Sequence, residues 1–349
     1  MRYKSLLFVA ILFSLSLSAQ KLEWKAGVYN FFDNTEFSKS SYAVAQTMAG
    51  VRFSPEIGLS VDSVHHLRFG IDVLKEYGSQ HYQDGYTTTA YYFYDSKPFK
   101  FYMGSFPRLG LLDAMPRAFF SDSIGYYRPN MTGFLWWYQK KQFDAKVFLD
   151  WTGKQTLSDH EAFFMGGMFL YRRSIYFAEL QSYMFHYAGS IEVRGVRDNG
   201  MLHAAIGLDL TSLTKLDTLS FRLGFLGGQE RLRKETLSWN MRNGILAELQ
   251  VGYKRMGLKS STYIGQGLMY DYPSMGSSLY WGDPLYRGTF YNRSDLFYDF
   301  FKSPFASARL TLSQHFSENQ CFFEQSLIVR IALDHNSKKS LHQSFNGKE

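Results

Sequence analysis

The residues with the most evident chemical potential lie in one segment, residues 107–129. Its charged side chains are Arg108, Asp113, Arg117, Asp122 and Arg128. Apolar side chains such as Leu111, Leu112 and Phe119 lie between them, and they predict that the segment packs against a surface. Because long structured loops usually serve a function, we expect this one to narrow a channel and to place its charges at the constriction. An external flap or a subunit contact is the open alternative.

Two histidine-containing motifs resemble catalytic or metal-binding sites, and the sequence argues against both. His342, Ser344 and Asn346 have the residue types of a hydrolase triad, but they follow the last expected strand. No scaffold there would hold a nucleophile against a base. The pair His65–His66 lacks a third metal ligand nearby and is expected in a solvated turn.

The glycine pairs and the single cysteine indicate no chemistry of their own. Neither Gly166–Gly167 nor Gly227–Gly228 is followed by the Lys-Ser/Thr of a phosphate-binding loop, so both are predicted as strand bends or bulges. Cys321 is the only cysteine, which excludes a disulfide within the chain and a cysteine-rich zinc site. We therefore expect a protein that is not an enzyme and that binds no cofactor or metal.

The composition indicates which elements must position these residues. Aromatic residues make up 18% of the 349 residues and charged residues 20%, with only 8 prolines against 29 glycines. This aromatic content excludes a disordered chain, and no apolar run after the first twenty positions is long enough for a transmembrane helix. The net charge of +7 comes without a basic stripe interleaved with aromatics, so nucleic acid is not an expected partner. Long β-strands fit this composition best.

Apolar and polar residues alternate along most of the remaining chain. From Phe143 onwards, one face has Phe143, Ala145, Val147, Leu149 and Trp151, and the other has Asp144, Lys146, Phe148, Asp150 and Thr152. Because successive strand residues point to opposite faces, such a segment has one apolar face and one face with charges. Similar segments begin near residues 49, 67, 245, 308 and 327. They run for about 10–14 residues, enough to cross a bilayer at a tilt of about 45°.

The connections predict how the strands are arranged. Short charged turns alternate with longer polar or glycine-rich segments, as in outer-membrane barrels with short periplasmic turns and longer extracellular loops. We predict an all-β fold, an antiparallel transmembrane β-barrel of about sixteen strands, with fourteen to eighteen left open. The first strand is expected near residues 23–32 and the last near 322–333. Closure leaves no strand edge facing lipid, and an even count puts both termini on the periplasmic side.

Both ends of the chain are expected outside the barrel. Residues 1–19 combine Arg2 and Lys4 with an apolar stretch and small residues before Gln20, which is typical of a secretory signal peptide. The barrel then occupies residues 20–333, and residues 334–349 form a polar tail. The expected location is the outer membrane of the cell.

A sixteen-stranded barrel is wide enough to hold a water-filled lumen. The charged side chains expected to line it are Arg68, Asp72, Lys100, Asp144, Lys146, Asp150, Arg222, Glu248, Lys254, Arg309 and Arg330. Charges are tolerated there if the lumen is wet or if they pair across strands, and both alternatives stay open. A girdle at the lipid–water boundary is expected from Trp136, Trp137, Tyr138, Tyr171, Tyr176, Tyr253 and Tyr270.

Together these features resemble the porin-like outer-membrane β-barrels of Gram-negative bacteria, and within them a little-characterised subgroup. The resemblance implies a channel for passive diffusion of small hydrophilic solutes, in contact with outer-membrane lipid. It implies no nucleic-acid partner and leaves a homo-oligomer open. The chain departs from porins in the residues that follow its last strand and in the nearly neutral charge of residues 107–129.

Two other functions are weighed against the channel. The first is a plugged barrel that serves as a structural, receptor or export component, with residues 107–129 and 271–290 as binding surfaces. The second is a barrel lipase, for which the sequence offers no convincing catalytic set.

Overall fold

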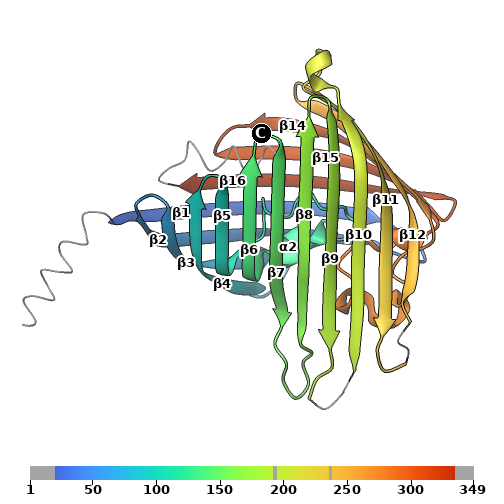
Figure 1. Cartoon of the computed structure of the whole chain (residues 1–349), viewed down its shortest axis with the longest axis horizontal. Coiled ribbons are helices and arrows are strands. Elements are labelled where there is room, and N and C mark those ends of the chain that lie inside the picture. Colours follow the sequence, from blue (N-terminus) through green and yellow to red (C-terminus); the bar gives the residue numbers. More distant parts are fainter. Residues whose placement is uncertain (1–19, 192–194, 236–237, 335–349) are drawn as a thin grey trace, which may run out of the picture.

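Sixteen antiparallel strands form a closed barrel in the computed structural model of the protein, which describes residues 20–191, 195–235 and 238–334 (Figure 1). The strands are β1 (Gln20–Glu36), β2 (Gln46–Val61), β3 (His65–Glu76), β4 (Gly85–Ser96), β5 (Phe99–Pro107), β6 (Asn130–Lys140), β7 (Phe143–Gly153), β8 (Ala162–Arg173), β9 (Tyr176–Ala188), β10 (Val196–Asp209), β11 (Thr218–Leu232), β12 (Asn240–Tyr253), β13 (Met256–Gly265), β14 (Phe290–Lys302), β15 (Ala306–Ser317) and β16 (Gln320–Asp334). Each strand pairs with its neighbours in sequence, and β1 pairs with β16 to close the sheet.

The predicted fold class is confirmed, because the structure has the expected topology and strand number. The first and last strands are longer than predicted and run over residues 20–36 and 320–334. The expected signal peptide and the tail beyond Asp334 lie outside the described residues, as does the His342 motif. Within the described residues, no helix is both long and apolar enough to cross a membrane.

The outer surface of the strands is apolar. Phe143, Val147 and Trp151 of β7 are exposed on the outside of the sheet, whereas Lys146 and Asp150 of the same strand are buried inside. A closed sheet satisfies its own backbone hydrogen bonds, and an apolar exterior of this kind requires lipid around it. The protein is therefore an outer-membrane β-barrel, as predicted.

The alternation also corrects part of the predicted aromatic girdle. Trp136 is 53% exposed, but Trp137 is buried on the inner face, where the ammonium groups of Lys100 and Lys146 lie over its ring. Consecutive residues of a strand face opposite sides, so both tryptophans cannot contact lipid. The prediction is wrong for Trp137.

Of the two predicted alternatives for the glycine pairs, strand bends or bulges, the bulges are wrong. Gly166–Gly167 and Gly227–Gly228 lie in β8 and β11 with uninterrupted strand register on either side. Gly166 instead leaves room for the ring of Phe148, because a Cβ at Gly166 would come within 2.7 Å of that ring. Register shifts occur elsewhere, in the β7–β8 and β14–β15 pairs.

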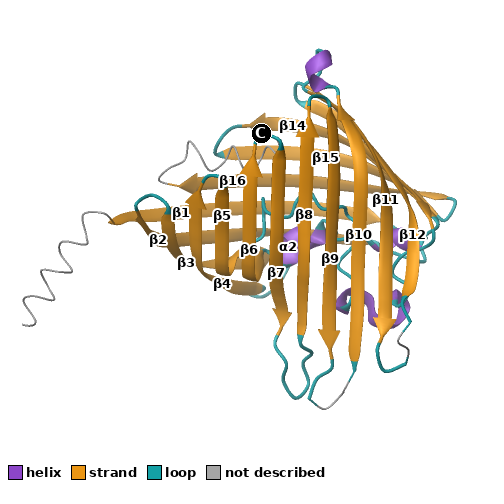
Figure 2. Cartoon of the chain, in the orientation of Figure 1, coloured by secondary structure: helices purple, strands orange, loops and turns teal. Residues whose placement is uncertain are grey.

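Short helices lie in the connections. They are α2 (Ser123–Tyr127), η2 (Thr211–Leu213), α3 (Tyr272–Met275), η3 (Gly276–Ser278) and η4 (Pro284–Arg287). α2 belongs to the third long connection (residues 108–129, the third loop), and α3, η3 and η4 belong to the seventh (residues 266–289, the seventh loop). Figure 2 shows α2 enclosed by the strands.

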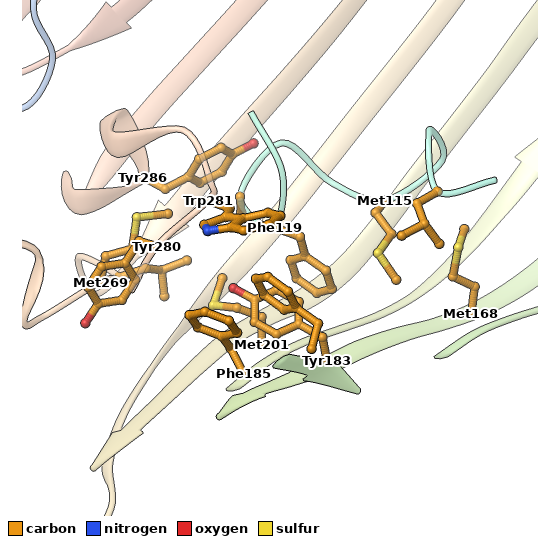
Figure 3. Close-up of a cluster of buried hydrophobic side chains, with 14 of the residues drawn as sticks. Met115, Phe119, Met168, Tyr183, Phe185, Met201, Met269, Tyr280, Trp281 and Tyr286 are labelled. Carbon is orange, nitrogen blue, oxygen red and sulfur yellow. The ribbon is translucent and has the colours of Figure 1, made fainter. Parts of the chain in front are cut away.

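The third and seventh loops fill part of the barrel interior with apolar side chains. Figure 3 shows Phe119 of the third loop and Trp281 of the seventh facing Tyr183 and Phe185 of β9. The two loops also bond to each other, since the Ser121 amide donates to the Trp281 carbonyl at 2.8 Å. The main hydrophobic core of this barrel is therefore built from its loops and its inner wall.

Candidate functional site

The third loop is fixed to the inner wall by ion pairs between charges of both signs. Arg117 lies 3.0 Å from Asp122 within the loop and 3.1 Å from Asp295 of β14. Arg293, also on β14, lies 3.1 Å from Asp122. Burial would raise the pKa of Asp122, but Arg117 and Arg293 outweigh it and hold that pKa below its usual value. The Asp122 carboxylate therefore stays ionised in this position.

This ion-pair network extends across β14–β16. Arg293 pairs with Asp295 at 2.7 Å and with Glu324 of β16 at 3.0 Å. The Nε2 atom of His315 lies 3.1 Å from Glu324, and its Nδ1 atom lies 2.9 Å from the Tyr291 hydroxyl. The side chains of these residues on β14–β16 are all buried: Tyr291, Arg293, Asp295, His315 and Glu324. Together with Arg117 and Asp122, this inner network connects the third loop to three strands.

The helix α2 packs against β1. The Tyr126 ring stacks on Phe31 with ring centroids 4.6 Å apart, and the Tyr126 hydroxyl donates to Asp33 at 2.9 Å. Arg52 of β2 donates to the Tyr126 carbonyl at 2.6 Å and pairs with Asp72 of β3. The helix α2 of the third loop is thus held by two neighbouring strands, β1 and β2.

The remaining charged residues of the third loop are engaged at its ends. Arg108 pairs with Asp150 of β7 and donates to the Arg128 carbonyl at 3.1 Å. The guanidinium of Arg128 lies 4.1 Å from the centre of the Trp281 ring. Asp113 accepts a hydrogen bond from the Gly110 amide within the loop. The five residues expected at a constriction therefore contact several separate parts of the interior.

Charged residues expected along the lumen are engaged mainly with other protein groups. The contacts join Arg68 to Glu23, Asp72 to Arg52, Lys100 to Asp95, Asp144 to Trp137, Lys146 to the Leu111 carbonyl, Arg222 to Glu179 and Glu248, Arg309 to Asp299, and Arg330 to the ring of Tyr29. Lys254 differs, because it is exposed in the turn after β12. Cross-strand pairing of this kind reduces the charge that a solute in the lumen would meet.

Histidine–carboxylate pairs are the groups here with the chemistry of a general base. Three face the barrel interior, with nitrogen–oxygen distances of 3.0, 3.5 and 3.1 Å, and they are His66–Glu23, His203–Glu179 and His315–Glu324. Their histidine side chains are at most 9% exposed. The prediction of a solvated turn is therefore wrong for His66, which is buried in β3. Among the described residues, no group of three or more metal-ligating side chains is present.

A fourth pair, His186–Asp198, lies on the outer face near the end of β9 and the start of β10, beside the connection between these strands. The Nδ1 atom of His186 is 3.7 Å from Asp198, and the histidine side chain is 22% exposed. His186 stacks on Phe163 with ring centroids 4.9 Å apart. Alternation places both residues on the same side as the exposed Leu202 of β10. This pair therefore faces the membrane side of the wall.

Two arginines complete an outer cluster that consists of His186, Asp198, Arg231 and Arg233. Asp198 pairs with Arg231 at 2.8 Å and with Arg233 at 2.7 Å. The hydrogen bond to Asp198 raises the pKa of Arg233. The side chain of Arg233 is 45% exposed, whereas that of Asp198 is 1% exposed. The cluster thus presents the guanidinium of Arg233 to the outside, keeps Arg231 less exposed against the ring of Trp239, and holds its one carboxylate beneath them.

Sequence reasoning missed the outer cluster because it assigned residues 188–199 and 229–242 to connections. β10 already begins at Val196, and β11 continues to Leu232. Asp198 faces His186 on one neighbouring strand and Arg231 on the other. The alternation around these positions was the available signal, but only the pairing of β9, β10 and β11 brings the three residues together.

Comparison with known proteins gives a family and a fold. The family model described as Lipid A 3'-O-deacylase-type matches residues 15–340. No curated protein matches the chain. A loop-deletion mutant of OmpT, an outer membrane protein of Vibrio cholerae, is similar with a TM-score of 0.55 and 7% identity, over 90% of this chain and 100% of that one. OpdK of Pseudomonas aeruginosa covers 90% and 99% of the two chains at 11% identity and a TM-score of 0.49.

The family match overturns one prediction from the sequence. The expectation that the protein is not an enzyme is wrong, because the matching family is described by a deacylase activity. The porin-like barrel architecture is retained, since the solved structure of OmpT supports the fold.

Proposed function

Because the chain belongs to the Lipid A 3'-O-deacylase-type family, we propose that it hydrolyses an ester-linked acyl chain of a lipid A-type molecule in the outer leaflet. The observation that carries this proposal is the extent of the family match, which runs from residue 15 to residue 340 and includes every strand. The third and seventh loops support it, because they pack inside the barrel and reduce the space for a solute path.

Access by a lipid favours the outer cluster as the reaction site. A lipid in the outer leaflet contacts the outside of the wall, where His186 and Asp198 lie. The interior pairs, such as His315–Glu324, are buried beneath the loops. A substrate anchored by several acyl chains would have to leave the bilayer to reach them.

The chemistry requires one water molecule and one base. His186 takes a proton from water while the water oxygen attacks the acyl carbonyl carbon, and a tetrahedral anion forms. The bond between that carbon and the lipid oxygen then breaks, and the proton on His186 passes to the departing oxygen. The products are a fatty acid and the lipid alcohol.

Neighbouring charges assist these steps. Asp198 stabilises the positive charge on the imidazole of His186, and Arg231 favours the negative charge on the intermediate. The 3.7 Å separation in the His186–Asp198 pair exceeds hydrogen-bond distance, so substrate binding must shorten it.

Fatty-acid release is the direct test. The purified full-length protein in detergent micelles is incubated with lipid A, and the products are followed by mass spectrometry. We expect one acyl chain to be lost, His186→Ala to slow the loss by about 10²–10⁴-fold, and His66→Ala, at an interior pair of the same type, to retain it. Unchanged lipid A with folded wild-type protein would refute the proposal. Heat-modifiable migration on gels reports folding of each variant.

Passive diffusion of small hydrophilic solutes is the second candidate function. A sixteen-stranded barrel has the width for it, and charged residues such as Arg68 and Arg222 lie on the inner wall. Conductance in planar bilayers tests it, with wild-type protein compared with a variant that lacks residues 110–126. A plugged barrel gives no current until the third loop is removed, whereas an open channel conducts in both forms.

A further inference from the structure

The outer wall has a hollow of about 370 Å³ that crosses β8–β12. Its apolar sides are formed by Met165, Met184, Leu202, Phe225 and Met241. Four of these are among the exposed large apolar side chains of the barrel exterior. The hollow therefore opens toward the membrane rather than toward the lumen, and we call it the wall groove.

Small residues create the depth of the wall groove. Its floor includes Ser182, Gly200 and Gly227, which lie on three adjacent strands. A Cβ at Gly200 would lie 3.0 Å from the Gln229 side chain, and one at Gly227 would lie 2.8 Å from the Phe225 ring. Any larger side chain at these positions would displace its neighbours or fill the groove. The floor is thus low, whereas the sides are apolar and flexible.

The outer cluster lies directly beyond the extracellular end of the groove. Gly200 pairs with Met184 and Gln229, and two residues further along β10 Asp198 pairs with His186 and Arg231. Residues two apart share a face and are separated by about 6.6 Å along a strand. The cationic cluster and the apolar groove are therefore continuous on one face of the wall.

The net positive charge of the outer cluster favours a ligand with an anionic head group. Arg231 and Arg233 share the single carboxylate of Asp198, which leaves a net positive charge at the lipid–water boundary. Each guanidinium also has more N–H donors than one carboxylate accepts, and phosphate oxygens fit this geometry well. This surface therefore complements a ligand that places an acyl chain in the wall groove and a phosphate at the outer cluster.

We propose that the wall groove and the outer cluster bind a phosphorylated lipid of the outer leaflet, with an acyl chain along Gly200 and Gly227 and a phosphate on Arg231 and Arg233. The inference deepens the proposed function and depends on it only for the catalytic step, because the groove would place the ester of such a lipid near His186. Binding itself does not require hydrolysis.

Lipid binding to the purified barrel tests the proposal. Diphosphoryl lipid A and chemically dephosphorylated lipid A are titrated in detergent, and bound lipid is counted by native mass spectrometry. We expect the phosphorylated form to bind at least tenfold more tightly, and Arg231→Gln with Arg233→Gln to remove that preference. Arg255→Gln, in the turn after β12, is the matched control and should bind as the wild type does. Equal binding of the two lipids, or no effect of the double variant, would overturn the proposal.

A second variant tests the groove without changing charge. Gly227→Leu should weaken the binding of both lipids, and heat-modifiable migration should show that the barrel still closes. If that variant does not fold, Ser182→Leu replaces it. Full fatty-acid release by a folded, groove-filled variant would reject the groove but keep the proposed activity. Tight, phosphate-dependent binding without fatty-acid release would reject the activity but keep the groove.

Discussion

The inner network and the outer cluster use the same residue types in opposite proportions. Inside the barrel, Arg117 and Arg293 share three carboxylates, those of Asp122, Asp295 and Glu324. Outside it, Arg231 and Arg233 share only Asp198. Burial adds to the contrast, because the Arg293 side chain is 6% exposed and that of Arg233 is 45% exposed.

This comparison separates charges that hold the protein together from charges that await a ligand. A buried guanidinium must have its carboxylates within the fold, since an unpaired buried charge is very costly. A half-exposed guanidinium at the lipid boundary can obtain an anion from the membrane instead. The inner network is therefore structural, and the outer cluster is the better candidate for function.

The largest effect on fatty-acid release is expected when one histidine of each region is replaced by alanine. His186→Ala should reduce fatty-acid release by about 10²–10⁴-fold, the usual contribution of a general base. His315→Ala should leave the release rate per folded molecule nearly unchanged. Rates are normalised to the heat-modifiable band of each variant. The comparison fails if His315→Ala is the inactive one.

The next effect concerns stability and should appear only on the inner side. Arg293→Ala leaves Asp295 and Glu324 buried without their cation, so we expect a loss of about 3–5 kcal/mol in the free energy of unfolding. Urea titration in detergent measures it by tryptophan fluorescence. Arg233→Ala is the outer counterpart and should change the unfolding midpoint little, because its side chain is largely solvated.

Acid should release the third loop only well below neutral pH. Because the folded pKa of Asp122 lies below its usual value of 3.8, the stabilisation from its ionised form is complete above that value. It is lost as the pH falls through the lowered folded pKa. Fluorescence of Trp281, in a variant that retains only this tryptophan, should stay constant from pH 7 to about pH 4. Asp122→Asn should show the released signal already at pH 7.

The smallest effect is expected at the partly exposed pair of Arg309 and Asp299. Their side chains are 37% and 14% exposed and lie 2.7 Å apart. Solvent screening limits such a pair, so Arg309→Gln should cost less than about 1 kcal/mol in the same urea titration. If Arg309→Gln lowers the free energy of unfolding as much as Arg293→Ala does, then the burial of an ion pair does not determine its contribution to stability, and the comparison of the two regions fails.

Much of the fold was predictable because each strand has one face toward lipid and one toward the barrel interior. Apolar and polar residues therefore alternate along it. The face with Phe143, Val147 and Trp151 was recognised as apolar from the sequence and is exposed to lipid in the structure. The packing of the third loop could also be anticipated from Leu111 and Phe119, which are apolar residues between charges. Patterns of this kind involve only residues that are close in sequence, so they can be recognised without knowledge of the fold.

The candidate site was not predictable in the same way. His186, Asp198 and Arg231 are separated by stretches of chain that look like connections, and only the strand register aligns them. The prediction that the protein is not an enzyme was wrong for a related reason. Residues that are close in sequence, such as His65–His66 and the His342 motif, offer no catalytic set, whereas the members of the outer cluster come from separate strands.

By itself, the sequence determined that this chain closes into an antiparallel barrel with an apolar outside, because side-chain alternation follows directly from residue order. Only the tertiary structure decided which charges are neutralised inside and which remain available outside. That division depends on strand register and on where the third and seventh loops pack, and both are contacts between residues far apart in the chain.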